Sequence, residues 1–428
     1  MRRLACVGVA FLASPIALFA QVPPPAKPAA QGPPKPAAAR ITSAQAESLI
    51  REVSGTVERL RQLKFKTPVA VEVIDGATAR KEFEAEIDDK ERERARHTRD
   101  AWVHLGLVPE KTDLVASELD LAETDVLGYY QSGSKVFRLL SHVAERDARS
   151  VMAHELTHAL EDQHYDLEAL QKRALNEDHA VAIRAVVEGS AMVTTLAMQQ
   201  RQGGIGKARE EAARASQERA KSVAGKPSFV QMRLMLPYTL GFSFLLRGKP
   251  WEWLFDGVRM DDIARAYADP PHSTREVLHP ESYWSRGRQA ARHVPLPALS
   301  KTLGPGFSLA LTGSIGELGL TLLTGSQLKA EGFYVLLPTR WTTQGATGNA
   351  GDIYQHYVNG EKKVTVFLTR WETSLDADEF QKSLRLRPIN KQIFRIGVNF
   401  VILLGDFGDA GQALATEATR GLKFWAGE

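Results

Sequence analysis

Cysteine is almost absent from this chain, which has a single one, Cys6, among its 428 residues. One cysteine cannot close an intramolecular disulfide, so the fold must be stabilised by its apolar core or by a metal. An excess of charge of one sign is also lacking, because the formal net charge is only +3 at pH 7. No cluster of Lys and Arg is interleaved with aromatic side chains, so we expect no nucleic-acid partner.

Long apolar runs are lacking beyond the N-terminus, so we expect no transmembrane span in the mature chain. At the N-terminus, Arg2 and Arg3 precede a largely apolar stretch, residues 4–20, that ends in small residues before Gln21. This pattern is typical of a secretory signal peptide, here residues 1–20, and predicts export to the periplasm or the extracellular space. An uncleaved membrane anchor is the alternative. Cleavage would also remove the cysteine.

Composition divides the rest of the chain into three parts. Residues 21–41 consist mostly of Pro, Ala, Lys and Gln, which is typical of an extended linker. Thr42 and Gln45 match a helix capping box, and apolar residues follow at helical spacing, so folding is expected to begin there. We therefore expect a first domain at residues 42–300 and a mixed α/β region at residues 301–428.

Strand signals occur in both folded parts. Residues 126–140 predict a β-hairpin, because two apolar segments flank a turn-forming cluster. In the C-terminal region, Asn359-Gly360 is a strong hairpin signal between two strand-like segments. A helix at residues 376–386 and two short strands within residues 391–404 complete the expected elements.

The strongest chemical signal is His154-Glu155-Leu156-Thr157-His158, an H-E-x-x-H pattern within a segment expected to be helical. Residues four apart share one face of a helix, so both imidazoles can point at one zinc ion. Glu155 lies beside this pair, where its carboxylate can accept a proton from a metal-bound water as that water attacks a carbonyl. We expect Glu155 to be the general base.

A third ligand is offered by Glu188, which lies among small and apolar residues of a second expected helix. An unpaired buried carboxylate is costly, and coordination to zinc would remove that cost. Pairing with Arg184 is the alternative. Gly189 and Ala191 are small enough to let this helix approach the metal-binding helix closely.

These residues resemble a known family. The segment from His154 to Gln163, followed by Ala185 to Ala191, is similar to the gluzincin metallopeptidases and to a set of secreted bacterial gluzincin-like proteins. Residues 269–283 and Gly351-Asp352 also resemble that set. The specific match covers about forty residues around the metal site.

The resemblance implies a helix-rich α+β fold with a zincin-like catalytic domain at residues 42–300. It implies zinc held by His154, His158 and Glu188, Glu155 as the base, and a peptide or protein substrate. It also implies that an edge strand before the metal helix, here in the hairpin at residues 126–140, binds an extended substrate through main-chain hydrogen bonds.

His164 is a competing third ligand, because it has the position of the third histidine in the metzincin pattern H-E-x-x-H-x-x-G-x-x-H. That pattern needs the helix to end at a glycine, but Glu161, a good helix former, stands in its place. If the helix continues, His164 lies about 15 Å further along the axis than His154. We therefore expect Glu188 to be the ligand.

Other candidates are ranked less well by sequence. Asp162 is expected either to orient a ligating imidazole or to be an exposed helix acid. Donors that could stabilise an oxyanion are Tyr238, His279 and Tyr283, which sequence does not rank. The histidines that lack ligand spacing are expected to be ordinary: His97, His104, His142, His179, His272, His293 and His356.

Three functions fit these patterns. The first is a zinc-dependent peptidase, the second is a zinc hydrolase that acts on a non-peptide substrate, and the third is a non-enzymatic envelope protein with a structural zinc clamp. Glu155 argues against the third, because a purely structural site needs no base.

Overall fold

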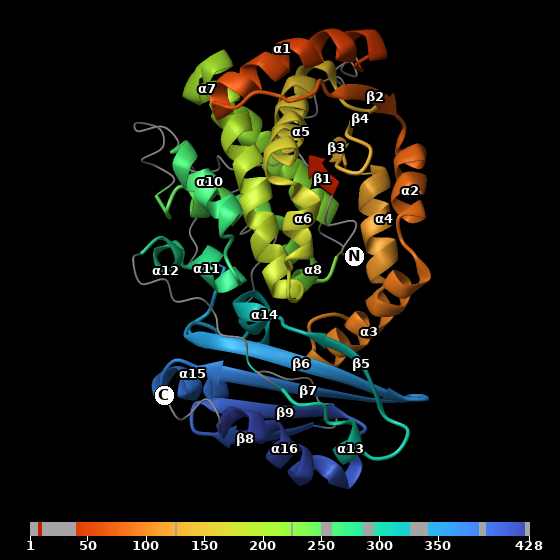
Figure 1. Ribbon diagram of the computed structural model, residues 1–428, viewed down its shortest axis with the longest axis vertical. Helices are drawn as coiled ribbons and strands as arrows, with labels where there is room; N and C mark the ends of the chain where they lie inside the picture. The colour runs from red at the N-terminus through yellow and green to blue at the C-terminus, as the bar shows by residue number, and fades with distance from the viewer. Residues whose placement is uncertain are drawn as a thin grey trace, which may run out of the picture.

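A computed structural model of the protein describes residues 7–10, 40–124, 126–223, 226–249, 259–285, 294, 296–325, 341–384 and 391–423. The described chain is α+β, as predicted, with a helical part above a five-stranded sheet (Figure 1). Residues 21–39 of the predicted linker and most of the predicted signal peptide lie outside the described residues.

The helical part is organised around three helices that cross close to one another, α5 (Glu145–Tyr165), α7 (Glu177–Val223) and α8 (Ser228–Leu245). Helix α1 (Ser43–Arg61) lies across the top of α5 and α7 (Figure 1). The Thr42 capping box forms as predicted: Gln45 N donates to Thr42 Oγ1 at 3.3 Å, and Thr42 N donates to Gln45 Oε1 at 2.9 Å. The fold begins slightly before this cap, because Ile41 is already buried.

Glycines allow α7 and α8 to cross with their backbones in contact. A Cβ atom on Gly189 would lie 2.3 Å from the carbonyl carbon of Gly241, and one on Gly241 would lie 2.1 Å from the carbonyl oxygen of Ala185. Neither position has room for any side chain. Gly189 therefore serves the packing of α7 on α8, and the prediction that it faces the metal-binding helix α5 is wrong.

A four-stranded sheet with the order β1-β3-β4-β2 packs beside α5. Its strands are β1 (Val7–Ala10), β2 (Ala70–Ile74), β3 (Gly128–Gln131) and β4 (Val136–Leu140). The predicted hairpin is confirmed, because β3 and β4 pair antiparallel with Tyr130 opposite Phe137. On its other side, β3 pairs antiparallel with β1, and Gly8 lies opposite Tyr130.

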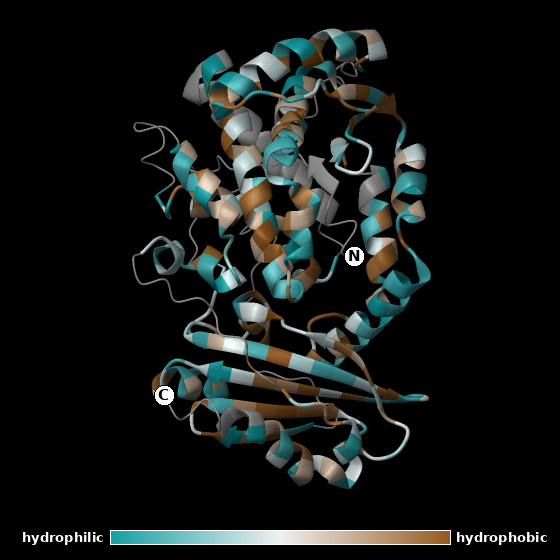
Figure 2. Ribbon diagram, in the orientation of Figure 1, coloured by the Kyte–Doolittle hydropathy of each residue, from teal (hydrophilic) through white to brown (hydrophobic). Residues whose placement is uncertain are grey.

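The C-terminal part is a five-stranded sheet with the order β5-β6-β7-β9-β8. Its strands are β5 (Ser308–Gly313), β6 (Asn349–Asn359), β7 (Lys362–Trp371), β8 (Lys391–Ile396) and β9 (Asn399–Gly405). Apolar residues run along the central strands β7 and β9 (Figure 2). The predicted hairpin turn is confirmed, because β6 and β7 meet at Gly360, whose φ of 57° suits glycine.

Shorter helices connect and cover these parts. They are α2 (Gly76–Ala85), α3 (Asp89–Leu105), α4 (Leu114–Thr124), α6 (Leu167–Lys172), α10 (Met260–Ala268), α11 (Thr274–Leu278), α12 (Pro280–Trp284), α13 (Ser300–Leu303), α14 (Gly316–Leu323), α15 (Ser374–Ser383) and α16 (Gly411–Lys423). Helix α15 corresponds to the helix expected at residues 376–386, and Thr373 caps it from before that range.

The C-terminal sheet contributes to two apolar clusters. One lies within the C-terminal part and includes Val366, Leu403 and Leu414, and the other is shared with the helical part. Trp102 and Leu105 of α3 are buried in one apolar cluster with Phe367 and Phe400 of the sheet. Phe229 of α8 joins the same cluster. A division of the chain at residue 300 therefore cuts through a shared core, which sequence composition did not indicate.

Among the described residues, one segment, Glu177–Arg201 of α7, is long and apolar enough to cross a membrane. The prediction that no such segment follows the N-terminal stretch is therefore wrong by length and composition. In the structure, 89% of that apolar window is buried inside the protein. A helix that is buried on most sides in the core of a large domain is apolar on most sides, because little of its surface meets water.

Candidate metal centre

Helix α5 carries the H-E-x-x-H pattern through its middle, and it continues without a break to Tyr165. His154 and His158 lie one turn apart on the same face, with ring centroids 4.7 Å apart and ring planes at 85°. Both side chains are buried, with exposed fractions of 2% and 0%. A helix turn therefore places two imidazoles together, as the spacing predicts.

Glu188 of α7 reaches the same point from the neighbouring helix. Its Oε2 atom lies 3.1 Å from His154 Nε2 and 3.4 Å from His158 Nε2. In a tetrahedral site with bonds of about 2.0–2.1 Å, ligand atoms are roughly 3.3–3.4 Å apart. The spacing of these three atoms therefore fits a shared metal ion.

The electrostatics of the three residues also fit a metal. Burial by itself would raise the pKa of Glu188, but the charges and hydrogen bonds of His158 and His154 outweigh it and lower the pKa to about 2. His158 Nε2 is buried and lies 3.4 Å from Glu188 Oε2, which is long for a hydrogen bond and leaves this pair of atoms suited to share a metal.

Arg184, the alternative partner of Glu188, does not appear among the contacts of that carboxylate. Glu188 interacts instead with His154 and His158. Arg184 acts electrostatically on a different carboxyl, that of Glu118. Burial raises the pKa of Glu118, and the positive charge of Arg184 offsets part of that rise.

His164 lies outside the cluster, as expected if the helix continues. Its Nε2 atom is 2.8 Å from the carbonyl oxygen of Lys64. Glu161, at the position where a helix-ending glycine would be needed, has helical backbone and is fully buried. The structure therefore brings Glu188, and not His164, to the two histidines.

Glu155 lies on α5 next to His154 and contacts strand β3. The backbone N–H of Tyr130 donates to Glu155 Oε2 at 2.6 Å. Glu155 is fully buried. This hydrogen bond ties the carboxylate to the strand that the resemblance assigns to substrate binding.

A buried network anchored on Glu161 holds helix α5 in place. Glu161 accepts hydrogen bonds from Arg61 at 2.6 Å, from Tyr267 at 2.5 Å and from Ser190. These partners come from α1, α10 and α7. All three partners are distant from Glu161 in the chain, so no local sequence pattern indicates this network.

Asp162 is buried, and its contacts differ from both expectations. It accepts hydrogen bonds from Tyr130 Oη at 2.9 Å, Lys135 Nζ at 2.6 Å and the backbone N–H of Leu167 at 3.1 Å. The two predictions, that it orients a ligating imidazole or is an exposed acid, are therefore wrong. Asp162 links the β3–β4 hairpin to the C-terminal end of α5.

The structure separates the three candidate oxyanion donors. Tyr238 of α8 stacks near His154, with ring centroids 6.0 Å apart. His279 instead contacts Glu317 at 2.9 Å, and Tyr283 donates to the carbonyl oxygen of Asp269 at 2.6 Å. Only Tyr238 of these three is placed against the cluster by a described contact.

A cavity of about 200 Å³ lies elsewhere, beside α14 and β6. Three buried carboxyls line it, those of Asp178, Glu317 and Asp352. Burial raises the pKa of Asp178 to about 6, and burial together with the charge of Asp178 raises the pKa of Asp352 to about 7. Asp352 also accepts hydrogen bonds from the backbone N–H groups of Ile315 and Gly316. The residues that line this cavity do not include His154, His158 or Glu188.

Comparison with known proteins adds no relative. No family model matches the chain, and neither curated proteins nor solved structures include a match.

Proposed function

We propose that the protein is a zinc-dependent hydrolase and that its substrate is a peptide or protein. The observation that carries this proposal is the buried cluster of His154, His158 and Glu188, with Glu155 next to His154 on α5 and bonded to the backbone of Tyr130. Two imidazoles and one carboxylate are the donor set of hydrolytic zinc sites, in which a fourth position is left for water.

Bound zinc would supply Lewis-acid chemistry, which makes water a nucleophile near neutral pH. The chain's own contribution is proton transfer by Glu155. Its carboxylate would take a proton from the attacking water and pass it to the leaving amine. The Tyr130 N–H bond to Glu155 Oε2 holds the carboxylate for this transfer. Tyr238, stacked near His154, is the best-placed donor for the negative charge that develops on the carbonyl oxygen.

Strand β3 supports a peptide substrate. Its Tyr130 touches Glu155 through the backbone, and its outer edge pairs antiparallel with β1 over Val7–Ala10. Those four residues belong to the predicted signal peptide. Cleavage before Gln21 would expose the β3 edge, and an extended substrate would then add to it antiparallel, as β1 does.

A structural zinc clamp is the second candidate, and the burial of all three metal-binding residues favours it. Their exposed fractions are 2%, 0% and 4% for His154, His158 and Glu188. The position of Glu155 distinguishes the two functions, because only the hydrolase needs it.

The test is Glu155→Gln in the exported protein, assayed for zinc content and for cleavage of a mixed peptide library. Glutamine keeps the size of the side chain but cannot accept the proton. We expect bound zinc to be unchanged and cleavage to fall by a factor of about 10²–10⁴. Glu168→Gln, on the exposed side of α6, is the matched control and should cleave normally. Normal cleavage by Glu155→Gln would exclude Glu155 as the base.

A further inference from the structure

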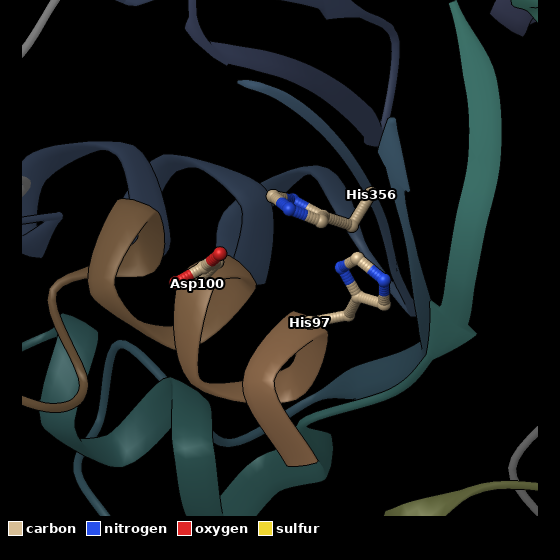
Figure 3. A group of neighbouring side chains, drawn as sticks. All are labelled: His97, Asp100 and His356. Atoms are coloured by element: carbon tan, nitrogen blue, oxygen red, sulfur yellow. The ribbon is translucent and has the colours of Figure 1, made fainter. Parts of the chain in front are cut away.

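A second cluster of metal-binding side chains lies between α3 and the C-terminal sheet. His97 and Asp100 lie one turn apart on α3, and both face His356 on β6 (Figure 3). One potential ligand atom from each of the three residues lies within 4.8 Å of the other two. His97 and His356 lack ligand spacing in the sequence and were not expected to bind a metal, because no motif joins residues so far apart in the chain.

The ring of His356 is the central observation. The side chain is fully buried, and its Nε2 atom has no hydrogen-bond partner among the described residues. Its other nitrogen, Nδ1, lies 2.9 Å from Thr365 Oγ1. Buried polar atoms are nearly always paired, so this unpaired nitrogen, on a residue that clusters with His97 and Asp100, points to a bound ligand.

The contacts of Thr365 allow the tautomer that a metal requires. Thr365 Oγ1 lies 2.9 Å from His104 Nδ1 as well as 2.9 Å from His356 Nδ1. A hydroxyl can accept from one ring and donate to the other. If His356 Nδ1–H donates to Thr365 and Thr365 donates to His104, the Nε2 lone pair of His356 is left free to bind a metal. Metal-binding histidines are commonly oriented by a bond to their other nitrogen.

Asp100 is already engaged by two cations. Arg99 contacts its Oδ1 atom at 2.6 Å, and Lys363 contacts its Oδ2 atom at 2.7 Å. The Lys363 side chain is 36% exposed, so its ammonium group can move into solvent when a dication takes its place beside Asp100. Arg99 can remain, because ligating carboxylates normally keep other hydrogen bonds.

We propose that His97, Asp100 and His356 form a second binding site, for a transition-metal dication of the zinc class. Two imidazoles and one carboxylate suit such an ion and suit the oxygen-preferring Ca²⁺ or Mg²⁺ poorly. The site joins α3, from the N-terminal half of the chain, to the middle of β6. Its bound metal would cross-link the helical part to the C-terminal sheet at the core that they share, and so stabilise the fold.

The first measurement is metal stoichiometry in the full-length protein, by elemental analysis and by the absorption spectrum of the Co²⁺-loaded form. We expect two ions in the wild type and one in His97→Ala. The same loss of one ion should follow from His97→Ala when His154→Ala and His158→Ala have already removed the first site. His97 lies on a helix, where alanine is well tolerated, so the variant should fold. His272→Ala, at a half-exposed histidine outside the cluster, is the control and should keep both ions.

The second measurement is competition by Lys363. Lys363→Met keeps much of the apolar stem but removes the cation, so Zn²⁺ should bind this second site roughly tenfold more tightly than in the wild type. His97→Ala that keeps two ions, or a folded His154→Ala/His158→Ala variant that binds none, would overturn the second site. An unchanged affinity in Lys363→Met would overturn the displacement of Lys363.

Discussion

Removal of Glu188 provides a direct test of the proposed metal centre. Glu188 is the one member of the cluster that does not belong to the H-E-x-x-H pattern, and it reaches both histidines from a separate helix. Glu188→Ala deletes that carboxylate and leaves the two imidazoles of α5 in place. Glu188→Gln deletes the charge but keeps the size, and so separates metal loss from the cavity that alanine leaves.

The size of the effect follows from the number of ligands. Zinc sites with four protein ligands bind with about 10–16 kcal/mol, so each ligand contributes roughly 2.5–4 kcal/mol. Loss of one should raise the dissociation constant for Zn²⁺ by a factor of about 10²–10³. Glu188→Gln should lose slightly less, since a neutral amide oxygen is a weaker ligand than a carboxylate.

The assay is competition for Zn²⁺ against a chromophoric chelator, with circular dichroism to establish that each variant is folded. Because a second, independent site is proposed, every variant and its reference protein are measured in the His97→Ala background. His164→Ala is the matched control: it removes a histidine from the same helix, but one that contacts the Lys64 carbonyl. Wild-type zinc affinity in Glu188→Ala, together with weak binding in His164→Ala, would refute the assignment of the third ligand.

Three further predictions concern the edge strand, helix packing and pH. A peptide with the sequence of residues 4–12 should inhibit the protein processed before Gln21, because those residues include the strand that pairs with β3, whereas a scrambled peptide should not. Gly189→Ala should destabilise the fold by about 1–3 kcal/mol or more in urea unfolding, because its Cβ would lie 2.3 Å from the backbone of α8. Gly55→Ala, at an open helix position, should instead stabilise it by about 0.5–1 kcal/mol. The pKa values of Asp178 and Asp352 are raised to about 6 and about 7 in the folded protein against 3.8 ordinarily, so the native state holds protons that the unfolded state has lost. Between pH about 4 and about 7 the free energy of unfolding of the wild type should therefore fall by a few kcal/mol relative to that of Asp178→Asn/Asp352→Asn, and a difference that does not change with pH would contradict the raised pKa values of these carboxyls.

Local patterns in the sequence were sufficient to predict individual elements. The Thr42 capping box, the Gly360 turn and the hairpin of β3 and β4 each depend on residues within a few positions of one another. Backbone conformation and short hydrogen bonds decide these elements, so a short window of sequence contains the needed information.

Contacts between distant segments were predicted poorly. Gly189 was assigned to the wrong neighbouring helix, since a small residue indicates a close contact but not its partner. Asp162 was predicted either to orient a ligating imidazole or to be exposed, yet it accepts hydrogen bonds from Tyr130 and Lys135 of the hairpin. Packing of α3 on the C-terminal sheet was likewise not visible, because the apolar residues Trp102 and Leu105 are separated from their partners by most of the chain.

The two candidate metal clusters show the same difference between local patterns and contacts of distant segments. In the first, the helical repeat itself brings His154 and His158 together, so one more acid in an apolar segment, Glu188, was enough to complete a prediction. In the second, the helical repeat places His97 beside Asp100, but a lone His and Asp one turn apart are common on charged helices and indicate nothing alone. Their partner lies on a strand whose position over α3 is fixed by the core of the C-terminal sheet. A metal site assembled across two parts of a fold can therefore be recognised only after the packing that joins those parts is known.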